Sequence, residues 1–109
     1  MKIHNDDKWP ELFQAPYTKI INGKAVKFSD VMVHSFSMGD VEDPDLYAGQ
    51  PLFEWQETEA GQWVMEHAAD KPYWVRRTDP YNFFGFRYYI FARMSEADQV
   101  FWQLKWNNV

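Results

Sequence analysis

Apolar and polar positions alternate along two long stretches of the chain, the pattern of β-strands with one buried face. These stretches are DVMVHSFSM, about residues 30–38, and FFGFRYYIFARM, about residues 83–94. Asn22-Gly23 lies between two short apolar runs and predicts a hairpin, because a type I′ turn needs positive φ at both central residues. The predicted strands cover residues 18–21, 24–28, 30–38, 73–78 and 83–94.

Two other stretches have helical spacing. The main helix is predicted at about 51–69, with Pro51 in its first turn and acidic residues where the helix dipole favours them. Its inward stripe is predicted to be Phe53, Gln56, Ala60, Trp63, Val64 and His67. A shorter helix follows Ser95, a typical N-cap residue. Its apolar stripe consists of Ala97, Val100, Phe101 and Leu104.

This order of elements predicts an α+β domain spanning residues 1–109, with a small antiparallel sheet and two helices on one face. Strand, helix, two strands and helix form a βαββα core, which is typical of the ferredoxin-like arrangement. An N-terminal arm, residues 1–17, and the hairpin precede that core. The last strand of the full arrangement would have to come from Lys105–Val109 or be replaced by the hairpin.

Composition adds two constraints. Aromatic residues make up 19% of the 109 residues, and they supply either a large buried area in a small core or an exposed recognition surface. The chain has no cysteine, which excludes disulfide scaffolds, thiolate zinc sites and cysteine nucleophiles. With no signal-like or membrane-length apolar run, we expect a soluble protein of the cytoplasm that has no membrane partner.

Charge is segregated along the chain. The net charge of −5 argues against a nucleic-acid partner, whose phosphates must be matched by basic residues. The segment 28–70 contains ten acidic residues and no Lys or Arg, whereas Lys71, Arg76, Arg77, Arg87 and Arg93 stand against Asp79 alone in the segment 71–93. These opposite charges can satisfy each other within one molecule or between two.

The acidic loop before the main helix is the first candidate site. Its carboxylates are Asp40, Glu42, Asp43 and Asp45. Counted from Asp40 as an EF-hand loop, position six is Asp45 and position twelve is Pro51, so the calcium motif fails. The favoured interpretation is a helix-capping turn with Asp43 before Pro44, and the loop remains a candidate interaction surface.

The histidines supply an alternative. His34 and His67 can approach each other across the core, and Asp40 can join them as a third polar group. Such a group would suit a small metal-dependent or acid/base enzyme. None of the histidines has the spacing of a known metal motif, and we expect no cofactor and no metal.

The strand at 83–94 carries the most specific pattern. Phe84-Gly85-Phe86, with Tyr89 beyond, resembles part of the signature of RNA-recognition motifs. In that family's register Arg87 would be buried, at a high cost for an unpaired guanidinium, so we reject this assignment. The opposite register buries Phe84, Phe86, Tyr88, Ile90, Ala92 and Met94.

An aromatic and basic sheet face then remains as a candidate interaction surface, because Arg and Tyr are enriched at the anchors of protein interfaces. Its predicted residues are Arg76, Arg77, Arg87, Tyr89, Phe91 and Arg93.

The run VEDPDLYAGQPLFEWQETEAGQWVMEHA, the long aromatic strand and the terminal Leu104-Lys105-Trp106 together resemble small proteins of tailed bacteriophages that have no known activity. The resemblance covers about residues 31–106 and rests on Glu42-Asp43-Pro44, Trp55, Gly61, Trp63 and His67 as well. It implies a setting in a host cell, with a host protein or the virion as the place of action.

The sequence thus favours a non-enzymatic protein-interaction module whose simplest partner is itself, as a homodimer. The alternatives are the small enzyme using His34, His67 and Asp40, and nucleic-acid binding through the Arg and aromatic strand face.

Overall fold

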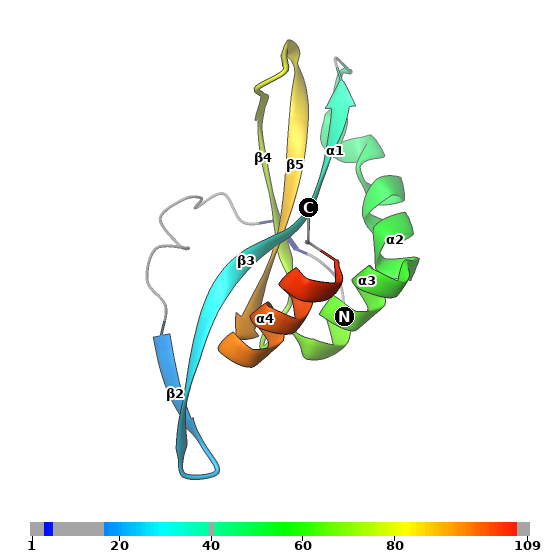
Figure 1. Ribbon diagram of the computed structural model, residues 1–109. Helices are drawn as coiled ribbons and strands as arrows, with labels where there is room; N and C mark the ends of the chain where they lie inside the picture. The colour runs from blue at the N-terminus through cyan, green and yellow to red at the C-terminus, as the bar shows by residue number, and fades with distance from the viewer. Residues whose placement is uncertain (1–3, 6–16, 40, 107–109) are drawn as a thin grey trace.

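The computed structural model describes residues 4–5, 17–39 and 41–106 (Figure 1). The elements in chain order are β1 (His4–Asn5), β2 (Tyr17–Ile21), β3 (Lys24–Gly39), α1 (Pro44–Tyr47), α2 (Gly49–Glu57), α3 (Glu59–His67), β4 (Tyr73–Asp79), β5 (Asn82–Ser95) and α4 (Glu96–Lys105). The strands form one sheet in the order β1-β4-β5-β3-β2. The pairs β2–β3, β3–β5 and β5–β4 are antiparallel, and the short β1 runs parallel to β4.

The predicted hairpin is confirmed. Asn22 and Gly23 have φ values of 52° and 78°, as the type I′ turn requires, and β2 pairs with the start of β3 from Tyr17↔Phe28 to Ile21↔Lys24. The two strands predicted at 24–28 and 30–38 are one continuous strand, β3. In Figure 1 the hairpin extends beyond the helices at one end of the sheet.

A β-bulge in β3 changes which residues face the core. The pairing with β5 shifts register between Met32 and His34, so the alternation of sides is interrupted there. Val33 is therefore buried in the same cluster against which Phe36 and Met38 pack. Met32 is exposed and pairs with Phe91 on the opposite face, so the simple alternation that would place Met32 and Phe36 on one face does not hold across the bulge.

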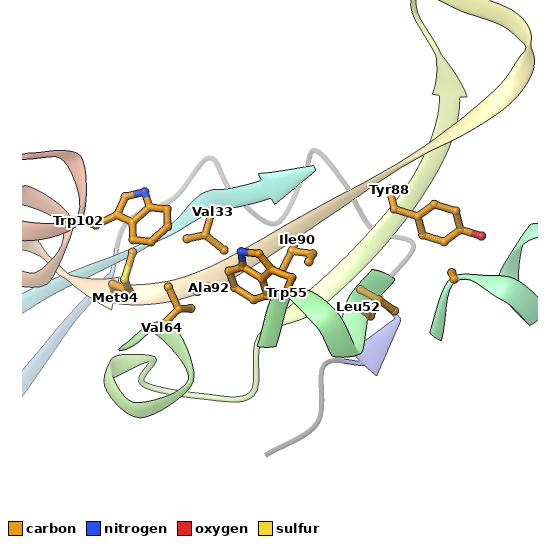
Figure 2. Close-up of a cluster of buried hydrophobic side chains, with 10 residues drawn as sticks. Val33, Leu52, Trp55, Val64, Tyr88, Ile90, Ala92, Met94 and Trp102 are labelled. Atoms are coloured by element: carbon orange, nitrogen blue, oxygen red, sulfur yellow. The ribbon is translucent and has the colours of Figure 1, made fainter. Parts of the chain in front are cut away.

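The main core lies between the helices and one face of the sheet. Alternate residues of β5 form the sheet side of this core. The buried ones are Tyr88, Ile90, Ala92 and Met94. These residues confirm the predicted register of β5. The side chain of Phe84, also predicted to be buried, lies outside the described side chains. Figure 2 shows the core side chains in a row along β5, with Leu52 and Trp55 of α2, Val64 of α3 and Trp102 of α4 packed on them.

The predicted main helix is wrong as a single element, because it is two helices separated at Thr58. Thr58 has an extended backbone, with ψ of 161°, and its Oγ1 accepts a hydrogen bond from the Gly61 amide at 3.0 Å, which caps α3. The same hydroxyl donates to the Trp55 carbonyl at 2.6 Å, at the end of α2.

The break rotates the inward stripe. Leu52, Trp55 and Val64 are buried, whereas the predicted inward residues Phe53 and His67 are exposed. Gly61 permits the close approach of the two helices, since a Cβ at this position would lie 1.9 Å from the Trp55 carbonyl oxygen.

The α+β class and the antiparallel sheet are confirmed. The complete ferredoxin-like arrangement is not supported: α1, α2 and α3 replace the single main helix, and β2 forms the sheet edge beside β3. Lys105 ends α4 and Trp106 is its C-cap residue, whereas residues 107–109 of the strand considered at Lys105–Val109 lie outside the described residues, as does most of the N-terminal arm. Within the described residues, no helix is long and apolar enough to cross a membrane.

Candidate interaction surfaces

The sheet face opposite the helices is partly buried. Tyr73, Val75 and Phe91 form a second apolar cluster there, with Tyr89 packed against it. Phe91 is 5% exposed, so it is not available to a partner as the sequence predicted. Of the two predicted aromatic residues of this face, Phe91 is therefore buried and Tyr89 is half-buried.

On this face, the Asp30 carboxylate accepts hydrogen bonds from Arg93 and Tyr73. The Arg93 guanidinium donates from Nε to Asp30 Oδ1 at 2.8 Å and from Nη2 to Oδ2 at 3.3 Å, and the Tyr73 hydroxyl donates to Oδ2 at 2.7 Å. The Asp30 side chain is 2% exposed, and the Arg93 guanidinium also lies 5.0 Å from the centre of the Tyr17 ring. Hydrogen bonding to Asp30 raises the pKa of Arg93, so this arginine is committed to an internal ion pair.

The other arginines of this face also have partners in the chain. Arg87 Nη2 donates to the Ser35 hydroxyl at 2.9 Å, and Arg77 Nη1 donates to the carbonyl oxygen of Arg76 at 2.7 Å. Near the β4–β5 turn, the Ser37 hydroxyl donates to Asp79 at 2.7 Å. This bond lowers the pKa of the Asp79 carboxyl, assisted by the Tyr81 amide.

Arg76 lies on the opposite face from Arg87 and Arg93. It forms a salt bridge with Asp45 at 3.1 Å, and its guanidinium lies 4.8 Å from the centre of the Phe86 ring. The Tyr88 hydroxyl donates a hydrogen bond to Asp45 as well. Burial, reinforced by Asp45, raises the pKa of Tyr88. Among the described residues of the predicted acidic surface, Asp45 binds the basic segment, and it does so within one chain.

The described acidic loop residues Glu42 and Asp43 line a pocket together with Asp45, Arg76 and Phe86. Glu42 and Asp43 are exposed, and Asp40 lies outside the described residues. Asp43 occupies the N-cap position of α1 with φ of 51°, but its side chain makes no capping hydrogen bond. Its carbonyl oxygen accepts from the Leu46 amide at 2.9 Å instead. The capping turn is present, and its cap comes from the backbone rather than from the predicted carboxylate.

The two histidines stack on different tryptophans. His34 is half-buried and lies 5.5 Å from Trp55 between ring centres, whereas His67 is exposed and lies 4.2 Å from Trp63. Burial lowers the pKa of His34, with a smaller contribution from the positive charge of Arg87. Among the residues that the structure describes, no group of three His, Asp or Glu side chains has a geometry suited to a metal ion.

The helix α4 has two distinct sides. Gln99, Trp102 and Trp106 face the sheet, and Gln99 Nε2 donates to the Ser29 hydroxyl at 2.6 Å and to the Met94 carbonyl oxygen at 2.9 Å. The opposite side is the apolar stripe found in the sequence, here called the outer α4 stripe: Ala97, Val100, Phe101 and Leu104. A helix normally buries such a stripe, yet Val100 is 52%, Phe101 46% and Leu104 70% exposed.

An aromatic cluster supports the outer α4 stripe from α3. Trp63 stacks on Phe101 with ring centres 5.1 Å apart, and Trp106 lies 5.4 Å from Trp63. Lys105 lies at the edge of this cluster. Its ammonium is 4.8 Å from the centre of the Trp106 ring and 3.1 Å from Glu59 Oε1. The cluster holds Phe101 in place while leaving one side of it open to solvent.

The sequence contained a signal for this surface. Gln99, Trp102 and Trp106 recur at helical spacing on the side of α4 opposite the apolar stripe, so two sides of one short helix could pack inward. The side with Trp102 is the one packed on the sheet, where Trp102 joins the core and Gln99 bonds to Ser29 and Met94. No protein-family model, curated protein or solved structure matches this chain.

Proposed function

We propose that this protein is a non-enzymatic protein-interaction module that binds its partner through the outer α4 stripe. The observation that carries the proposal is the outward position of Val100, Phe101 and Leu104 on one helix. Contiguous apolar side chains at the surface expose area that water disfavours, and such patches mark interaction sites. The aromatic support from Trp63 makes Phe101 a preorganised anchor, which lowers the entropic cost of binding.

The outer α4 stripe is apolar and lies outside the acidic segment 28–70 and the basic segment 71–93. Arg93 already pairs with Asp30, whose side chain is 2% exposed, so a partner for this arginine would have to compete with a buried bond inside the chain. The outer α4 stripe has no such competition, since hydrophobic contact with a partner replaces only water. The resemblance to small phage proteins supplies a setting in which such a module binds a host protein, a virion protein or another copy of itself.

Site-specific photo-crosslinking tests the proposal. A photoreactive amino acid at position 104 is compared with the same amino acid at position 46, because Leu104 and Leu46 are 70% and 73% exposed and lie on different helices. In a lysate of the native host cell, we expect a discrete adduct from position 104 and none from position 46. Equal labelling from both positions, or no adduct from position 104, would overturn the proposed binding surface.

A further inference from the structure

We infer that the partner is a second copy of this chain, and that two α4 helices pack antiparallel across a two-fold axis between Val100 and Phe101. This inference rests on the proposed function, and it names the partner that the same surface accepts. The residues of α4 are complementary to their own reversed order in both size and charge. Self-complementarity of this kind is what a two-fold interface requires.

The apolar residues are complementary in size. In the antiparallel pair, the two-fold axis passes midway between Val100 and Phe101 of each helix. Ala97 then faces the partner's Leu104, and Val100 faces the partner's Phe101. The small Ala97 therefore leaves room for the larger leucine, and this happens twice by symmetry. Alternation of small and large side chains lets two helices approach to an ordinary packing distance.

The polar flanks are complementary in charge. At about 100° per residue, Asp98 and Lys105 lie on one flank of the outer α4 stripe, and Glu96 and Gln103 lie on the other. A two-fold axis across antiparallel helices brings like flanks together, so Asp98 meets the partner's Lys105 and Glu96 meets the partner's Gln103. A parallel pair would place like charges opposite each other and align the helix dipoles unfavourably.

Lys105 is available for this contact. Its bond to Glu59 is a surface ion pair, with side chains 48% and 78% exposed, and such pairs contribute little. The ammonium can therefore bind the partner's Asp98 while staying close to Glu59. Because α4 has only 10 residues, the helix pair is a small interface, and we expect association in the micromolar range.

Sedimentation velocity over a range of protein concentrations tests the dimer. We expect the wild-type mass to rise from 13.1 kDa toward twice that value. Leu104→Glu buries a charge in the interface and should weaken association at least about tenfold. Leu46→Glu makes the same change at an equally exposed leucine on α1 and should leave association unchanged. A wild type that stays monomeric at high concentration, or a dimer indifferent to Leu104→Glu, overturns the inference.

Single cysteines test the orientation, and the native chain contains none to interfere. Under mild oxidation, a mixture of Ala97→Cys and Leu104→Cys should form a mixed disulfide dimer. Each variant alone should remain largely unlinked, because its two cysteines would lie about 10 Å apart along the antiparallel helices. Strong linking of each variant alone would show a parallel pair and overturn the antiparallel arrangement.

Charge reversal tests the flank. Lys105→Glu should weaken the dimer several-fold, and adding Asp98→Lys should restore it, since the ion pair is rebuilt with opposite polarity. Glu59→Gln removes the internal partner of Lys105 and serves as the control, with no loss of association expected. Failure of the double variant to recover would contradict the assigned contact between Asp98 and the partner's Lys105.

The crosslinking adduct separates this inference from the proposed function. An adduct from position 104 with twice the chain mass supports both. An adduct of another mass, with a monomeric pure protein, overturns self-pairing and leaves the interaction module standing. The absence of any adduct overturns both.

Discussion

The inner and outer sides of the helical layer are both apolar, but only the inner side is explained by the fold. Leu52, Trp55, Val64 and Trp102 are buried against the sheet. Phe53, Val100, Phe101 and Leu104 lie on the outer side and face solvent. Burial stabilises a protein through the area removed from water, so the inner residues support folding and the outer ones contribute little to it. The exposed outer side is the observation on which the proposed binding role rests.

The same substitution on the two sides gives the largest contrast. Leu52→Ala should lower the free energy of unfolding by about 3 kcal/mol, because it leaves a cavity in the core. Leu104→Ala should change it by less than about 0.5 kcal/mol in dilute solution, where any dimer has dissociated. Urea denaturation followed by tryptophan fluorescence measures both. Similar losses from the two variants would show that the outer side also supports the monomer.

A pair of glycines gives the next largest effect. Gly61→Ala should lower the free energy of unfolding by about 2 kcal/mol, since the new methyl group collides with the Trp55 carbonyl between α2 and α3. Gly49→Ala has no neighbour within 4 Å and should raise stability by up to about 1 kcal/mol through helix propensity. Thermal denaturation compares the two variants. A stabilising Gly61→Ala would contradict the tight junction between the helices.

Loss of the polar residue Gln99, which bonds α4 to the sheet, should have a smaller effect on the free energy of unfolding. Gln99→Ala removes hydrogen bonds to the Ser29 hydroxyl and the Met94 carbonyl, and should lower the free energy of unfolding by about 1 kcal/mol. Gln103→Ala changes an exposed glutamine of the same helix and should lie within about 0.5 kcal/mol of wild type. The measurement is chemical denaturation of each variant. Equal losses of unfolding free energy in the two variants would show that the Gln99 hydrogen bonds do not help to hold this side of α4 against the sheet.

The smallest effect concerns pH. Burial and the charge of Arg87 lower the pKa of His34 in the folded protein below 6.5, its ordinary value in the unfolded chain. Below pH 6.5 the unfolded chain therefore binds more protons, and stability is lost as the pH falls toward the folded-state pKa. His34→Gln should reduce this loss, as seen in denaturation curves at several pH values. An unchanged acid dependence in the variant would exclude His34 as its source.

Most secondary structure was predictable because its signals are local. Asn22-Gly23 specifies the hairpin by backbone geometry, and Ser95 caps α4 by accepting a bond from the Asp98 amide, as predicted. The register of β5 followed from the cost of burying Arg87, which needs no knowledge of the rest of the chain. Each of these depends on residues close in sequence.

The predictions were wrong where contacts between residues distant in sequence override the local apolar pattern. The bulge after Met32 and the helix break at Thr58 each change the side that later residues present, and simple periodicity does not show either shift. Two members of the candidate sheet face have surroundings that their sequence neighbours do not show. Phe91 and Arg93 belong to a surface pattern in sequence, yet one is buried and the other pairs with Asp30, which is 63 residues away.

By itself, the sequence determined the α+β class, the hairpin and the alternation of β5, because propensity, turn chemistry and the cost of buried charge act over short distances. Only the tertiary structure decided which side of α4 packs on the sheet, because its two sides are both suited to burial. The inward side is held by Trp102, which is buried in the core, and by Gln99, which bonds to Ser29 and Met94 on two different strands only in the folded chain. That choice leaves Val100, Phe101 and Leu104 at the surface, where a second molecule can reach them.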